Sequence, residues 1–162
     1  MRDDHERSLA WLEGRIAAGE SFRGLAEAAV AHLRSRYDSY DWVGIYMLDG
    51  EGLRLWAWDG PAATEHVHIP LDRGVCGYAA ATGQTINVPD VQADERYLQC
   101  FLGTRAELVV PITAGERVYG EVDIDSDRPA AFGDGDEAFL AAFCERLGAL
   151  AERETLPARE PR

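Results

Sequence analysis

The chain has 162 residues, 46% of them hydrophobic and 28% charged, and its formal net charge is −13. This length fits a single domain, and the apolar fraction is too high for a disordered chain. The negative charge repels phosphate groups, so we expect neither nucleic acid nor an anionic membrane surface as a partner. No apolar run reaches the ~20 residues of a membrane span, and the acidic N-terminus is unlike a signal peptide. We therefore expect a cytoplasmic protein.

Hydrophobic spacing predicts helices at both ends of the chain and strands between them. Two helices precede residue 40, and Ser21 is the expected N-cap of the second. A turn at residues 49–52 predicts a hairpin. The later elements are, in chain order, strands at 41–48, 53–58 and 66–70, a helix at 74–82, a strand at 85–88, a loop at 89–104, strands at 107–113 and 117–125, and a helix after 132–134.

This order predicts an α+β fold in which a six-stranded antiparallel sheet has the terminal helices on one face. The short helix and the long loop would then close the other face and leave a ligand pocket there. A loop of more than ~15 residues inside a compact domain is more often functional than idle. We expect a single domain over residues 1–152 and a disordered tail over 153–162, which has two prolines and no apolar stripe.

Carboxylates gather on one face of the predicted sheet. Glu121, Asp123 and Asp125 alternate with apolar residues, so their side chains share a face of the strand. The preceding strand has the same alternation and adds Glu107. We predict a three-residue loop at 114–116 that pairs Glu107 with Asp123, because a two-residue turn would mix polar and apolar faces.

Two environments are possible for this acidic face. If it were open to water, the crowding of like charges would cost only a few tenths of a kcal/mol. However, Trp42 and Tyr46 also share one face of their strand, and large aromatic residues beside acids favour a covered pocket. Under cover, crowded carboxylates cannot all ionise, so one should hold a proton near neutral pH. Such a group can bind a ligand ammonium or act as a general acid.

The three cysteines have no CxxC spacing, which argues against a disulfide framework or a zinc knuckle. Cys76 opens the short helix, where the helix dipole and the neighbouring Arg73 should lower its pKa. Cys100 lies in the long loop and is expected to be accessible, whereas Cys144 falls on the apolar side of the last helix and should be core. For Cys76 and Cys100, the structural and the redox interpretations both stay open.

A histidine pair is the remaining candidate metal site. His66 and His68 share a face of the predicted third strand, but no third ligand stands at a matching spacing. We therefore expect no metal.

Five segments together resemble a known family. They are DWVGIY at 41–46, IPLDRGVCG at 69–77, NVPDV at 87–91, ELVVP at 107–111 and VDIDS at 122–126. This combination resembles the GAF domain of free methionine-(R)-sulfoxide reductases and extends over nearly the whole chain, from about residue 8 to residue 150. The resemblance implies a GAF fold and a small cytosolic enzyme, usually a homodimer. It also implies reduction of the R epimer of free methionine sulfoxide, with thioredoxin as the external reductant and no bound cofactor.

The resemblance also implies residue roles. Cys100 stands at the position of the nucleophile, and Cys76 at that of a cysteine lining the site. The acids Glu107, Asp123 and Asp125 would hold the substrate amino group and assist loss of the sulfoxide oxygen. The aromatic residues Trp42 and Tyr46 would flank the methyl-sulfur end.

One position departs from the family. His66 stands where the family has its resolving cysteine, ten residues before Cys76, and we place it among the substrate-binding residues. Either Cys76 takes over resolution, or an external thiol reduces the oxidised Cys100, or the protein is a non-catalytic GAF module that binds or senses a small molecule.

Overall fold

The computed structural model describes residues 1–97 and 103–161. These ranges contain four α-helices, six strands and one 3-10 turn, and the predicted α+β fold with a six-stranded antiparallel sheet is confirmed. In chain order the elements are α1 (Arg2–Ala17), α2 (Phe22–Arg36), β1 (Trp42–Asp49), β2 (Gly52–Asp59), β3 (His68–Pro70), α3 (Gly74–Thr82), β4 (Ile86–Val88), the turn Val91–Ala93, β5 (Ala106–Ala114), β6 (Arg117–Ser126) and α4 (Asp134–Arg153). None of these helices is long and apolar enough to cross a bilayer.

The strands lie in the order β3-β2-β1-β6-β5-β4, and each pairs antiparallel with its neighbours. β6 is therefore a central strand, flanked by β1 and β5. Because β6 carries the three alternating acids, this order puts them in the middle of the sheet, away from its edges.

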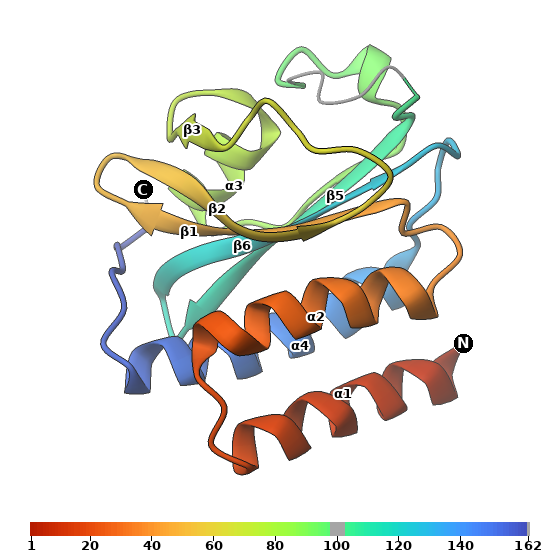
Figure 1. Ribbon diagram of the computed structural model, residues 1–162. Helices are drawn as coiled ribbons and strands as arrows, with labels where there is room; N and C mark the ends of the chain where they lie inside the picture. Colours follow the sequence, from red (N-terminus) through yellow and green to blue (C-terminus); the bar gives the residue numbers. More distant parts are fainter. Residues whose placement is uncertain (98–102, 162) are drawn as a thin grey trace.

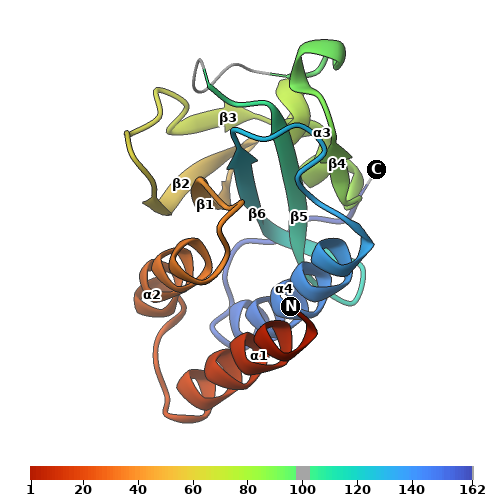
Figure 2. The same cartoon turned by 90° about the vertical axis from the view of Figure 1, so that its right-hand side faces the viewer.

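The two faces of the sheet are covered by different helices (Figures 1 and 2). α2 and α4 pack against one face, and α1 forms an outer layer against both of them. α3 lies across the opposite face and contacts β5 and β6. The predicted location of the terminal helices is thus confirmed, although α1 reaches the sheet only through the other two.

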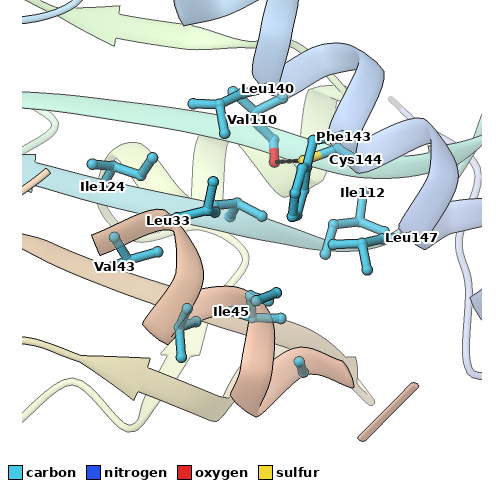
Figure 3. Packing of buried hydrophobic residues seen from close by; sticks show 14 of the residues in the cluster. Leu33, Val43, Ile45, Val110, Ile112, Ile124, Leu140, Phe143, Cys144 and Leu147 are labelled. Carbon is cyan, nitrogen blue, oxygen red and sulfur yellow. Dashed lines mark hydrogen bonds between the residues drawn. The ribbon is translucent and has the colours of Figure 1, made fainter. Parts of the chain in front are cut away.

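The main core lies between the sheet and its two helices (Figure 3). Val43 of β1, Val110 of β5 and Ile124 of β6 point toward the helix side, where they meet α2 and α4. Cys144 of α4 is buried in this core, and its thiol donates to the Val110 carbonyl at 3.6 Å. The expectation that Cys144 is a core residue is confirmed.

The predicted register of β5 and β6 is wrong. The turn has two residues, with Ala114 opposite Arg117, and the register shifts between Ile112 and Thr113. Gly115 adopts a φ of +58°, which suits it to the tight turn. The bulge adds one residue to β6 and so restores the separation of polar and apolar faces that the shorter turn would have destroyed.

This bulge decides which acids are neighbours. Glu107 lies opposite Asp125, and Asp123 lies opposite Val109. The predicted pairing of Glu107 with Asp123 is therefore replaced, but all the acids remain on the predicted face.

One residue of the C-terminal segment, which we expected to be disordered, pairs with β6. The backbone N–H and C=O of Arg159 pair with those of Val118, both at 2.9 Å. The pairing of β6 with β1 ends at Gly120, so Val118 has a free outer edge that the returning chain can occupy.

Candidate functional site

The acidic cluster consists of Glu107, Glu121, Asp123 and Asp125, and it lies on the face of the sheet opposite α2 and α4. Their exposed fractions are 4%, 0%, 1% and 2%. The face is therefore covered, which excludes the alternative of a solvated outer surface. β5 supplies the first of the four, and the alternation of β6 supplies the others.

Cys76 is brought to the acids by the first turn of α3. Its Sγ lies 3.4 Å from Asp123 Oδ2 and 3.8 Å from Glu107 Oε1. Gly77 allows the helix to come this close to the chain before it, because a Cβ there would lie 2.7 Å from the Pro70 carbonyl oxygen. The position of α3 therefore brings the Cys76 thiol into direct contact with the carboxyl groups of Asp123 and Glu107.

Several oxygens of the acidic cluster have no hydrogen-bond partner within the described part of the chain. They are both oxygens of Glu121, both of Asp125, and Oδ1 of Asp123. None of the ion pairs in residues 1–97 and 103–161 involves a cluster acid. Buried carboxyl oxygens without partners are costly, so this arrangement calls for a proton or a cation.

Burial is the main cause of the electrostatic behaviour of the cluster. It raises the pKa of Glu107, Glu121 and Asp125 well above the usual range, and neighbouring acids raise it further. The pKa of Asp123 is also raised by burial, with smaller opposing effects from Glu107, Cys76 and His66. The cluster therefore retains protons to higher pH than isolated carboxyl groups do, which is the direction expected from the crowding of acids.

The expected lowering of the Cys76 pKa is wrong. Burial raises it well above the ordinary thiol value, and the negative charges of Asp123, Glu121 and Glu107 add to the effect. Arg73, which we expected to favour the thiolate, is exposed. The helix dipole is weaker than the combined effect of desolvation and nearby carboxylates.

The two aromatic residues lie beside the acids, as the strand alternation predicted. Trp42 is 2% exposed and pairs in register with Asp125; Tyr46 is 0% exposed and pairs with Glu121. The Trp42 ring lies against the backbone at Gly44, where a Cβ would collide with the indole. The aromatic and acidic residues therefore line the same covered face.

His66 lies outside the strand to which we assigned it. β3 begins at His68, so the prediction that the two histidines share a strand face is wrong. The His66 backbone N–H donates to Thr64 Oγ1 at 3.1 Å, and its carbonyl accepts from Tyr46 Oη at 2.8 Å. These contacts bend the chain and place His66 near Asp123.

A cavity of about 420 Å³ reaches the acidic face where β1 begins and β6 ends. Trp42 and Asp125 line it, together with Arg34, Asp41 and Thr104. It offers one route from the surface toward the acidic cluster.

Cys100 and Glu121 differ from the other site residues. Cys100, the predicted nucleophile, lies outside the described residues, so its role stays a prediction. Glu121 was placed on the acidic face by its alternation with Val122, but it was not among the predicted site residues. Its full burial next to Cys76 makes it a fourth member of the cluster.

Comparison with known proteins shows the family to which this chain belongs. The model of the GAF domain matches residues 21–150. The chain is 33% identical over 133 residues to the free methionine-R-sulfoxide reductase of Escherichia coli (strain K12), covering 82% of this chain and 79% of that protein. It is 30% identical over 146 residues, 90% of either chain, to GAF domain-containing protein A of Dictyostelium discoideum. The X-ray structure of free methionine-R-sulfoxide reductase from Neisseria meningitidis, in complex with its substrate, is 31% identical with a TM-score of 0.85, covering 94% of this chain and 92% of that one. The chain belongs to the GAF domain family.

Proposed function

We propose that this protein reduces free methionine (R)-sulfoxide to methionine. The observation that carries the proposal is the acidic cluster, buried under α3 with several carboxyl oxygens unpartnered. A buried carboxylate is stabilised by a cation, and the α-ammonium of a free amino acid is such a cation. The similarity to reductases of this name from Escherichia coli and Neisseria meningitidis supports the same substrate.

The cluster would select the free amino acid over a methionine sulfoxide within a peptide. Asp123 and the neighbouring acids of the cluster bind the ammonium. Trp42 and Tyr46 contact the methyl-sulfur end, and His66 completes the lining of the substrate pocket. A peptide-bound residue has no α-ammonium, so it would leave a desolvated carboxylate unpaired and is rejected.

The reductive step takes place at sulfur. The Cys100 thiolate attacks the sulfoxide sulfur while Glu107 or Asp125 protonates the sulfoxide oxygen. The oxygen passes to Cys100, which becomes a sulfenic acid, and methionine leaves with its sulfur reduced.

The oxidised nucleophile is then recycled by thiols. Cys76 condenses with the Cys100 sulfenic acid, forming a disulfide and releasing water, and a thioredoxin-type dithiol reduces this disulfide. The step requires the two Cα atoms to approach to about 6 Å. No bound cofactor takes part. We propose that this cycle runs in a cytoplasmic homodimer.

The test is turnover of racemic methionine sulfoxide with dithiothreitol, followed by chiral separation of the remaining substrate. We expect the R epimer alone to disappear, because the proposed pocket fixes the ammonium and the sulfur at once. N-acetylmethionine sulfoxide serves as the control and should persist. Equal loss of both epimers, or equal turnover of the acetylated compound, would contradict the proposal.

The second candidate is a non-catalytic GAF module that binds a small amine. It is favoured by His66, which stands at the position of the resolving cysteine. Its signature would be a raised melting temperature with methionine sulfoxide but no consumption of either epimer.

A further inference from the structure

We propose that Cys76, Glu107 and Asp123 form a binding site for one thiophilic divalent cation, of which Zn²⁺ is the biological representative. The site uses part of the acidic cluster, but its existence does not depend on the reductase activity.

The three ligand atoms already have the spacing of a metal site. One thiol sulfur and one oxygen from each carboxylate lie within 4.8 Å of one another. The two sulfur–oxygen distances are 3.4 and 3.8 Å. In a tetrahedral site with Zn–S near 2.3 Å and Zn–O near 2.0 Å, the sulfur–oxygen edge is about 3.5 Å. Both sulfur–oxygen distances therefore match the corresponding edges of a Zn²⁺ site to within a few tenths of an ångström.

Glu121 is an independent indication that the site takes a cation. Its side chain is 0% exposed, and neither of its oxygens has a hydrogen-bond partner in the part of the chain described. Its charge acts on the Cys76 thiol, although its oxygens lie outside the group of three ligand atoms. Asp123 Oδ1 is likewise unpartnered. Cation binding would satisfy buried oxygens that the protein leaves unsatisfied.

The donor set selects the class of metal. A thiolate favours Zn²⁺ or Cd²⁺, whereas Mg²⁺ and Ca²⁺ prefer sites built from oxygen alone. On binding, the Cys76 S–H bond breaks and a sulfur–metal bond forms. The thiol proton, and any proton held by the Glu107 or Asp123 carboxyl group, passes to solvent, with no change in oxidation state. A dication also offsets the charge of two carboxylates in the low-dielectric interior.

The experiment titrates the full chain, stripped of metal and kept reduced, with ZnCl₂ in a calorimeter and with CdCl₂ in an ultraviolet spectrometer. We expect one ion per chain and a sulfur-to-cadmium charge-transfer band. Cys76→Ser should abolish the band, and Asp123→Asn should weaken binding by about tenfold or more. Cys144→Ala is the matched control, because its thiol lies in the core on the other face, and it should keep the band. Thermal unfolding of each variant verifies that it folds.

Two results would overturn the proposal. One is a folded wild-type chain that gives no charge-transfer band with CdCl₂. The other is binding of ZnCl₂ that persists unchanged in both Cys76→Ser and Asp123→Asn, since the ion would then be held by other groups. Neither measurement uses methionine sulfoxide. Loss of metal binding with turnover intact therefore contradicts only this site, and metal binding without turnover contradicts only the proposed reaction.

Discussion

The thiol of Cys76 lies 3.4 Å from the Oδ2 of Asp123, which joins the first turn of α3 to the central strand β6. This contact holds the thiol in a protonated state, because burial and the adjacent acids raise its pKa. Cys76 is therefore poorly suited to be the first nucleophile. The proposed cycle accordingly gives the attacking role to Cys100, the residue to which the family resemblance assigns it.

Cys100→Ser tests that division of roles. The hydroxyl is a much weaker nucleophile than a thiolate, so turnover with dithiothreitol should fall on the order of 10³-fold or more. The matched control is Cys144→Ala, which removes a thiol from the core and should keep its turnover per folded molecule. Retention of full activity by Cys100→Ser would remove that residue from the mechanism.

Cys76→Ser tests the recycling step. If Cys76 resolves the sulfenic acid, the ratio of thioredoxin-supported to dithiothreitol-supported turnover should fall by about tenfold or more, a barrier increase of at least ~1.4 kcal/mol. Dithiothreitol can reduce the sulfenic acid directly, so its rate is less dependent on a second protein thiol. An unchanged ratio would instead support direct reduction of Cys100 by an external thiol.

Glu121→Gln tests the energetic cost of the acidic cluster. The wild-type carboxyl group is fully buried and its oxygens are unpartnered, whereas in the unfolded chain it ionises freely. Removing the ionisable group should raise the free energy of unfolding at neutral pH by about 1 to 2 kcal/mol. Urea unfolding in the presence of a chelator measures the difference. Equal stability of the two proteins at neutral pH would show that Glu121 carries no such cost.

The pH dependence of stability follows from the same raised pKa values. Glu107, Glu121 and Asp125 titrate at higher pH in the folded state than in the unfolded state. The folded protein then binds more protons, so the free energy of unfolding falls as the pH rises above ~4 toward the folded pKa values. Chemical unfolding across this range should show the decline, with a shallower slope in Glu121→Gln. A stability that rises with pH over the same range would contradict the raised pKa values.

Strand periodicity was sufficient to predict the acidic face. Glu107, Asp123 and Asp125 share that face because alternation depends only on parity. The two-residue turn and the bulge in β6 together move the register by two residues, which preserves parity. The bulge itself has no signal in local hydrophobicity, so the partner of Glu107 was predicted wrongly. The pattern along a strand therefore predicts which face of the sheet a residue occupies more reliably than it predicts the partner of that residue on the next strand.

Features that depend on the surroundings of a residue were harder to predict. The pKa of Cys76 was assigned from its place at a helix start, but its burial among acids reverses the direction of the shift. His66 has the sequence pattern of a strand residue, yet its contacts with Thr64 and Tyr46 hold it in a bend. The pairing of Arg159 with Val118 depends on where the pairing of β6 with β1 ends, which no property of the tail sequence reveals.

Gly44→Ala tests whether the position of Trp42 matters for binding. Gly44 lies between the two site aromatics on β1, and a Cβ there would collide with the Trp42 ring and lie 3.3 Å from Leu55 Cδ1. The indole must move, which should destabilise the fold by about 1 to 3 kcal/mol and raise the KM for methionine sulfoxide. Gly14→Ala is the matched control: Gly14 lies in α1, and a Cβ there would meet no other part of the protein within 4 Å, so alanine should stabilise the helix by up to ~1 kcal/mol. A KM that stays at the wild-type value in a folded Gly44→Ala protein would show that the indole does not contact the substrate.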